Sequence, residues 1–145
     1  MLEELQTIEF YYEDIDFKLD HQEKYAEWLK NIASSNQKSI GELSYIFSTD
    51  EKVLEINKQY LNHDYYTDII SFPYDLDPIS GDIYISIDRV KDNAIGLDID
   101  FQEELHRVMA HGLLHFIGFD DHSEKDIKAM RKAENTAIEQ YKILG

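Results

Sequence analysis

The hydrophobic and polar positions of the chain fall into short runs that predict four β-strands. Most of these runs are rich in β-branched and aromatic residues, and one, DIYISI, alternates between polar and apolar positions. The predicted strands cover residues 7–12, 40–48 and 82–87, and the run 69–75 as far as Pro73. Pro73 is expected to end the third strand, because proline cannot donate a hydrogen bond to a sheet. The turn residues DLDPISG come next and predict a hairpin between the third and fourth strands.

Apolar residues that recur every three or four positions predict five helices. They are expected after Asp20, at 50–61, at 88–97, from about 101 to 117 and from Ser123 to about 140. Most of the starts carry a capping residue, and three carry a pair that is typical of a capping box. The expected caps are Thr49 or Asp50, and the pairs Asp20 with Glu23, Asp100 with Glu103 and Ser123 with Asp126.

The order of these elements, β-α-β-α-β-β-α-α-α, predicts an α+β fold in which helices cover a small mixed sheet. The chain has 145 residues, which suits one compact domain. It contains no internal repeat, no low-complexity segment and no linker rich in Pro, Gly or Ser. We therefore expect a single domain over residues 1–145.

The composition narrows the classes of partner and site. Lysine and arginine number 14 against 30 aspartates and glutamates, so the formal net charge is −16 at pH 7. This balance excludes a basic protein that coats nucleic acid, and an RNA partner would have to meet a local cationic or metal site. With no cysteine, a disulfide framework, a thiolate nucleophile and a cysteine zinc site are all excluded. Metal ligands must come from His, Asp or Glu.

The N-terminal segment MLEELQTIEFYYEDIDF is acidic and lacks the features of a signal peptide. No apolar run approaches the roughly 18–20 residues that a membrane helix needs. A soluble, cytoplasmic protein is expected.

Three of the six histidines lie close together in the segment 111–122, HGLLHFIGFDDH. On a helix of about 100° per residue, His111 and His115 are separated by only about 40° around the axis, so both face one direction. Gly118 suits a left-handed C-cap that ends the helix and lets the chain turn back, so that His122 can join the pair. Three imidazoles and a water are typical of an open, catalytic Zn²⁺ site, where the pKa of the water falls to about 7.

Other interpretations of the same segment remain open. A solvated helix face also gives an H-x-x-x-H pair, and Asp120 or Asp121 is an alternative third ligand to His122. His106 lies about 140° around the helix from His111 and is expected to be a polar or partly buried residue away from the ion. Glu104 is expected either to orient a ligand imidazole or to favour the start of the helix through its charge.

The segment HGLLHFIGFDDH resembles the H-G-x-L-H-x-x-G-[YF]-D-H signature of the YbeY-type endoribonucleases, a metal-dependent family of ribosomal RNA maturation factors. Two more segments resemble that family in the same order. NKQYLNHDYYTDIISFP (57–73) is similar to N-x-x-Y-R-x-K-D-x-P-T-D-V-L-S-F-P, and GDIYIS (81–86) is similar to G-D-I-x-I-S. Together with Met130 and Glu134 in the last predicted helix, the resemblance covers about residues 43–135.

This resemblance implies an α+β fold with a three-histidine metal site, most simply one Zn²⁺ per chain. On the matching positions, the implied metal ligands are His111, His115 and His122. The implied activity is endonucleolytic cleavage of single-stranded RNA in ribosomal RNA maturation, at the 3′ end of the small-subunit rRNA, and in ribosome quality control. The implied partners are ribosomal RNA and the small ribosomal subunit or its assembly proteins, with no membrane and no DNA. No catalytic residue is assigned.

The chain departs from the family pattern at three places. His122 follows His115 by seven residues instead of six, and Tyr66 replaces a proline. Leu61 replaces an arginine that the family is thought to use against phosphate or transition-state charge, a role that leucine cannot fill. Lys58 and His63 are the candidate replacement cations.

The polar residues Thr67, Asp68 and Ser71 enter the third predicted strand and suit either a turn or the floor of a cleft. For Thr67 and Asp68 the turn is favoured.

Two other functions stay in view. A metal-binding ribosome-assembly factor with little nuclease activity would fit Leu61 and the charge of −16. A hydrolase of another substrate, such as a peptide, is disfavoured because Gly112 stands where H-E-x-x-H proteases carry their general base.

Overall fold

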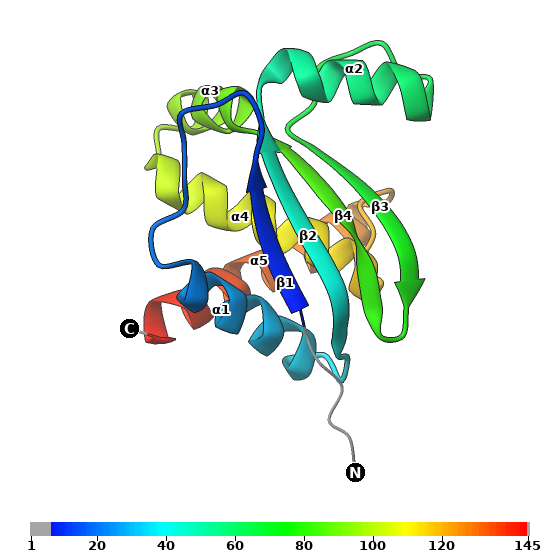
Figure 1. The fold of residues 1–145 in the computed structure, drawn as a ribbon. Coiled ribbons are helices and arrows are strands. Elements are labelled where there is room, and N and C mark those ends of the chain that lie inside the picture. Colours follow the sequence, from blue (N-terminus) through cyan, green and yellow to red (C-terminus); the bar gives the residue numbers. More distant parts are fainter. Residues whose placement is uncertain (1–6, 145) are drawn as a thin grey trace.

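A four-stranded mixed sheet forms the centre of the computed structural model, which describes residues 7–144 (Figure 1). Its strands lie in the order β1-β2-β4-β3, in which β1, β2 and β4 are parallel and β3 runs antiparallel to β4. The hairpin predicted between the last two strands is thus confirmed. The strands are β1 (Thr7–Tyr12), β2 (Ile40–Ser48), β3 (Ile69–Leu76) and β4 (Ile79–Ser86).

The prediction that Pro73 ends the third strand is wrong. Strand β3 continues to Leu76, with Pro73 opposite Gly81 and a shift of register between Pro73 and Asp75. The physical reason is the position of β3 at the edge of the sheet, where a missing N–H breaks no central ladder. The turn is accordingly shorter than the sequence suggested.

Five helices pack around the sheet in the predicted order (Figure 1). Helix α4 lies against β3 and β4 and is covered by α5, while α1 packs on both α4 and α5. Helix α2 packs against β3 and β4, and its Val53 and Ile56 form a small apolar cluster with Ile70 of β3. The helices are α1 (Gln22–Ser35), α2 (Asp50–Leu61), α3 (Ile87–Leu97), α4 (Phe101–Ile117) and α5 (Glu124–Leu144).

The predicted caps form at some helices and not at others. The Thr49 hydroxyl accepts a hydrogen bond from the Lys52 amide, and Ser123 and Asp126 form the reciprocal pair of a capping box. The capping boxes at the other two helices are wrong. Helix α1 follows His21 in a left-handed conformation, and the Asp100 side chain makes no capping bond. A polar residue at the right spacing caps a helix only where the backbone before the helix directs its side chain toward the free N–H groups of the first turn.

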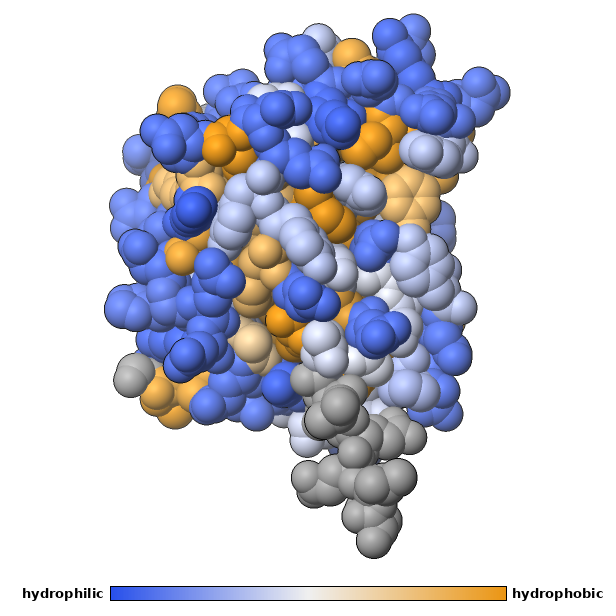
Figure 2. Space-filling view, viewed as in Figure 1, coloured by the Kyte–Doolittle hydropathy of each residue, from blue (hydrophilic) through white to orange (hydrophobic). Residues whose placement is uncertain are grey.

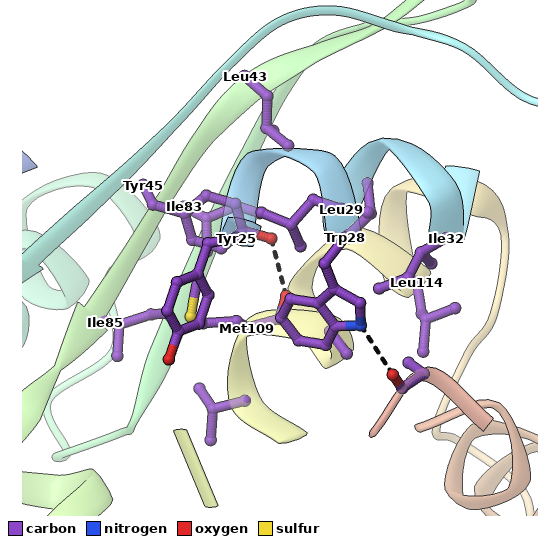
Figure 3. Close-up of a cluster of buried hydrophobic side chains, with 14 of the residues drawn as sticks. Tyr25, Trp28, Leu29, Ile32, Leu43, Tyr45, Ile83, Ile85, Met109 and Leu114 are labelled. Carbon is purple, nitrogen blue, oxygen red and sulfur yellow. Dashed lines mark hydrogen bonds between the residues drawn. The ribbon is translucent and has the colours of Figure 1, made fainter. Parts of the chain in front are cut away.

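The main core lies between the sheet and helices α1, α4 and α5 (Figure 3). Trp28 is fully buried there, and its indole N–H donates to the Ala137 carbonyl oxygen at 2.7 Å. The buried Tyr45 hydroxyl donates to the Met109 carbonyl at 2.8 Å. These bonds satisfy the polar ends of two large side chains and tie α1 to α5 and β2 to α4. Of these two bonds, the second fixes helix α4 to the sheet.

Hydrophilic side chains dominate the rim of the face shown in Figure 2, and paler and apolar side chains lie between them. Within residues 7–144, no helix is long and apolar enough to cross a membrane. The first six residues of the N-terminal segment and Gly145 lie outside the described residues. The single domain over residues 1–145 stays a prediction.

Candidate metal centre and its cleft

The two histidines of the last turns of α4 face the same direction, as their spacing predicted. The rings of His111 and His115 are inclined at 79° with their centroids 4.7 Å apart. Both side chains are partly exposed, 22% for His111 and 30% for His115, so their nitrogens are accessible from solvent.

Helix α4 ends at Gly118, which has a φ of 127° and sends the chain back toward the two histidines. This conformation is costly for residues with a Cβ atom and explains why glycine is needed there. The returning segment brings Asp121 to the pair, with its Oδ2 atom 3.7 Å from His111 Nε2 and 3.5 Å from His115 Nε2. The three ligand atoms all lie within 4.8 Å of one another.

His122 is exposed and does not join this group in the described part of the chain. Its assignment as the third ligand stays a prediction. Asp121, which the sequence offered as the alternative, is the residue that the structure brings to the histidine pair. Asp121 follows His115 by six residues, which is the separation that the family signature has between its second and third histidines.

The separations between these donors fit a small divalent ion. Two donors at about 2.0–2.1 Å from one tetrahedral zinc ion lie roughly 3.4 Å apart. The observed distances of 3.5 and 3.7 Å from Asp121 to the two histidines are close to that value. Two imidazoles and a carboxylate are also a common donor set for catalytic zinc. The residues present therefore fit a metal ion.

Glu134 of helix α5 holds His111 from behind. Its Oε2 atom lies 2.7 Å from His111 Nδ1, and its Oε1 atom accepts from Arg107 at 3.1 Å. Because the carboxylate fixes the proton of the ring on Nδ1, the lone pair of Nε2 is directed toward His115 and Asp121. Sequence reasoning noted Glu134 only as part of the family pattern, because a contact between two helices leaves no local spacing signal.

The charges around His111 shift its pKa and that of Glu134. Burial alone lowers the pKa of His111, but the hydrogen bond and charge of Glu134, with Asp121 and Asp68, raise it above its ordinary value. Burial alone raises the pKa of Glu134, but its bonds to His111 and Arg107 lower it. These shifts favour an ionised Glu134 carboxylate that accepts a hydrogen bond from His111 Nδ1.

Glu104 makes no hydrogen bond to His111 or His115 among residues 7–144. Its buried Oε1 atom has no hydrogen-bond partner among residues 7–144, and the nearest cation is Arg107 Nε at 4.0 Å. Burial and the nearby Asp68 carboxylate raise the pKa of Glu104. The sequence left open whether Glu104 orients a histidine of the pair. In the structure, Glu134 makes that contact, with His111.

A cleft of about 530 Å³ opens in front of the histidine pair. Its lining comes from α4 and the turn after it, from the end of α2, from the segment 62–68 and from β3. Leu61, His63 and Ser71 are among the lining residues. The sequence segments that resemble the family at 57–73 and 111–122 therefore meet at one place.

Thr67 and Asp68 line this cleft and also make local contacts. The Thr67 hydroxyl donates to the Ile69 carbonyl at 3.4 Å, and the Asp68 carbonyl accepts from the Ser86 amide at 2.9 Å. The Asp68 carboxylate accepts from Asn93 of helix α3, and burial raises its pKa. The favoured structural role is consistent with these bonds, and both residues also form part of the cleft wall.

His106 and Gly112 point away from the cleft. His106 is buried in an aromatic cluster and its Nε2 atom lies 2.9 Å from the Tyr25 hydroxyl, as its place on the helix predicted. Gly112 faces the sheet, where a Cβ atom would lie 2.8 Å from Ile69 Cδ1. A general base at position 112 would therefore lie against the sheet instead of in the cleft.

Comparisons with known proteins bear on the family of the chain. A family model described as Endoribonuclease YbeY matches residues 7–142. An Endoribonuclease YbeY from Flavobacterium psychrophilum is 48% identical over 137 residues, which cover 94% of this chain and 97% of the relative. One from Bacteroides thetaiotaomicron is 50% identical over 113 residues, or 77% of this chain and 82% of the relative. The solution structure of a Thermotoga maritima protein matches with a TM-score of 0.64 and 25% identity, covering 94% of this chain and 89% of that one.

Proposed function

Because the chain belongs to the YbeY endoribonuclease family, we propose that it cleaves RNA in the cleft beside His111 and His115, with a metal ion held by these two histidines. The chain is a metal-dependent endoribonuclease of ribosomal RNA maturation. The observation that carries the location is the convergence of His111, His115 and Asp121, three side chains that could hold a metal ion, in the lining of one cleft.

Each residue of the centre has a distinct task in this proposal. His111 and His115 supply neutral imidazole nitrogens, and Glu134 holds the His111 ring in the tautomer that leaves Nε2 free to bind. The cleft residues from α2 and β3 align the RNA strand against the pair. A divalent ion held by these residues would supply Lewis-acid chemistry, which polarises a phosphodiester and activates a water or a 2′-hydroxyl. Zn²⁺ is the proposed ion, because imidazole and carboxylate ligands at these separations suit it.

The third ligand comes from the segment 120–122. His122 is the proposal that follows from the sequence signature, and its side chain would have to turn inward to reach the pair. Asp121 is the second candidate, and its distances of 3.5 and 3.7 Å to the two histidines favour it. If Asp121 is the third ligand, the spacing of six residues after His115 equals that of the family signature, and His122 is the extra residue that follows the ligand.

The substrate proposed for the cleft is single-stranded ribosomal RNA, at the 3′ end of the small-subunit rRNA. The proposed partners are the small ribosomal subunit or its assembly proteins, and the proposed location is the cytoplasm, where bacterial ribosomes are assembled. The family model spans residues 7–142, which supports one functional domain over residues 1–145.

Metal analysis of purified full-length variants tests the site. We expect about one zinc ion per chain in the wild type and a loss of most bound zinc in His111→Ala and His115→Ala. His106→Gln is the matched control on the same helix and is expected to retain its zinc, because His106 lies in the aromatic cluster of α1 and α5. Stoichiometric zinc in both alanine variants would contradict the site.

The third ligand is decided by zinc affinity in Asp121→Asn, His122→Asn and Asp120→Asn. The variant that loses the ion identifies the ligand, and the other two serve as its controls. Cleavage of single-stranded rRNA with and without a chelator then tests the activity. RNA cleavage that survives complete metal removal would overturn the metal-dependent mechanism, whereas a zinc-loaded protein that leaves RNA intact would support an assembly factor without nuclease activity.

A further inference from the structure

We propose that His63 is the residue of this cleft that contacts the phosphate of the RNA substrate. The inference rests on the proposed function, in which RNA occupies the cleft beside His111 and His115. An RNA strand brings one negative charge per phosphate into a wall that already contains the Asp68 and Asp121 carboxylates. Such a site needs a donor or a cation directed at the phosphate.

Among the residues that line the cleft there is no lysine and no arginine. Apart from the metal-binding pair His111 and His115, His63 is the lining residue that can carry a positive charge. Leu61 lies in the same wall and is 39% exposed, but its side chain offers neither charge nor hydrogen bond.

Three basic residues outside the lining of the cleft have acidic partners. Lys58 does not line the cleft, and its Nζ atom lies 3.4 Å from Asp64. Arg89 is bound to Asp50 at 2.6 Å. Arg107 is bound to Glu134 at 3.1 Å. Of the two replacement cations that the sequence left open, the geometry thus favours His63 over Lys58.

The segment that carries His63 is tied to the end of helix α2. Asn62 ends that helix in a left-handed conformation, and the His63 amide donates to the Asn57 carbonyl at 3.1 Å. The buried Asn57 side chain in turn donates to the Tyr65 carbonyl at 2.9 Å. These bonds fix the path of the chain on both sides of His63, so the imidazole is held at the cleft wall.

Tyr65 orients the His63 ring and leaves one nitrogen available. The Tyr65 hydroxyl lies 3.0 Å from His63 Nδ1, and the two rings are in contact, tilted at 35° with their centroids 5.1 Å apart. When this hydroxyl donates to Nδ1, the proton of the neutral ring sits on Nε2. Nε2 has no hydrogen-bond partner within the part of the chain that the structure describes. It can therefore donate to a phosphate oxygen in either protonation state of the ring.

Cleavage kinetics of the zinc-loaded, full-length protein on a single-stranded rRNA oligonucleotide test this role. We expect His63→Ala to lower kcat/KM about tenfold, the effect of losing one hydrogen bond to a charged group. Lys58→Ala removes a basic side chain from the same segment outside the cleft, and its kcat/KM is expected to stay within about twofold of the wild type. Zinc affinity is expected to be unchanged in both variants, because neither residue contacts the metal-binding group.

A second pair of variants separates loss of the contact from loss of structure. We expect His63→Lys to keep most of the activity, because its ammonium group also binds phosphate. Leu61→Arg in the His63→Ala background is expected to recover activity by placing a guanidinium group in the same wall. The proposal is overturned if His63→Ala retains full kcat/KM, or if Lys58→Ala loses as much as His63→Ala.

Failure of this inference differs from failure of the proposed function. If the wild type binds zinc and cleaves RNA while His63→Ala is equally active, only the role of His63 is wrong. If the zinc-loaded wild type cleaves no RNA, the proposed function fails, and the inference fails with it.

Discussion

At the scale of single residues, the pKa of each histidine of helix α4 depends on the side chains that contact it from other elements. His111 meets the Glu134 carboxylate of α5 at 2.7 Å, whereas His106, five residues earlier on the same helix, meets the hydroxyl of Tyr25 and the rings of Trp28 and Tyr141. An acidic partner raises the pKa of His111, and burial lowers that of His106 to about 4. One helix thereby carries a histidine that lies at the candidate metal site and a histidine that is buried in the core.

We expect Glu134→Gln to weaken zinc binding about tenfold, the lower end of the effect seen when a carboxylate behind a ligand histidine is removed. Glutamine can still accept from His111 Nδ1, but it lacks the charge that strengthens the imidazole as a donor. Zinc affinity is measured by competition with a chromogenic chelator. Glu139→Gln, an exposed change on the same helix, is the control. Equal affinity in Glu134→Gln and wild type would show that the contact is not used in binding.

The buried His106 predicts a loss of stability in mild acid. Its folded-state pKa of about 4 lies below the ordinary value of 6.5, so between these values the unfolded chain binds a proton that the folded chain does not. The contribution of His106 to the free energy of unfolding is therefore fully present above about pH 6.5 and is lost as the pH falls toward 4. We expect the free energy of unfolding to fall by about 2 kcal/mol from this group between pH 7.5 and 5.0.

Urea denaturation of the metal-free protein at both pH values measures this loss. His106→Gln keeps a polar group near the Tyr25 hydroxyl but cannot titrate, so its stability should fall less than that of the wild type over the same range. The same pH dependence in both proteins would assign the effect to other groups.

At the scale of elements, the cleft depends on close contact between the β3–β4 hairpin and helix α4. Gly81 of β4 lies where these three elements meet, opposite Pro73. A Cβ atom there would lie 2.5 Å from the Phe72 carbonyl oxygen and 3.0 Å from the ring of Phe116, which lines the cleft. The clash with a backbone atom cannot be relieved by turning a side chain.

We therefore expect Gly81→Ala to lower the free energy of unfolding by about 2 kcal/mol, as overpacking of a tight contact does. The matched control is Gly96→Ala in helix α3, where a Cβ atom meets nothing within 4 Å. Alanine in an exposed helix is expected to leave stability unchanged or raise it by up to about 1 kcal/mol. Denaturation curves of the two variants provide the measurement, and equal stabilities would contradict the close contact at Gly81.

At the scale of the whole molecule, the enzyme carries a net charge of −16 and acts on a polyanion. Long-range repulsion slows the encounter with RNA, so the attraction has to come from local groups. Salt screens this repulsion over a distance of about 10 Å at 0.1 M. A basic protein usually binds nucleic acid less tightly as the salt concentration rises. For this acidic protein we expect the opposite, so that salt favours its association with RNA.

We expect kcat/KM on a single-stranded rRNA oligonucleotide to rise about two- to threefold as monovalent salt increases from roughly 20 to 150 mM. A dinucleotide with one phosphodiester is the control, because its small charge makes it nearly insensitive to the field of the protein. A steep fall of kcat/KM with salt would show that a local basic surface governs association instead.

The sequence by itself determined the features that depend on neighbouring residues along the chain. The periods of two and of about 3.6 located the strands and helices in the correct order, and the four-residue spacing placed His111 and His115 on one face of α4. Gly118 marked the end of that helix. Each of these signals is local, because side-chain direction in a regular element repeats with a fixed period.

Only the tertiary structure decided the contacts between segments that are distant in the sequence. It put β3 at an edge, where Pro73 could stay within the strand, and it brought Glu134 of α5 behind His111. It also brought His63 to the same cleft as the histidine pair, and it brought Asp121 instead of His122 close to the ring nitrogens of that pair. The path of the chain after Gly118 and the packing of α5 on α4 set these distances, and no spacing along the chain encodes how two elements pack.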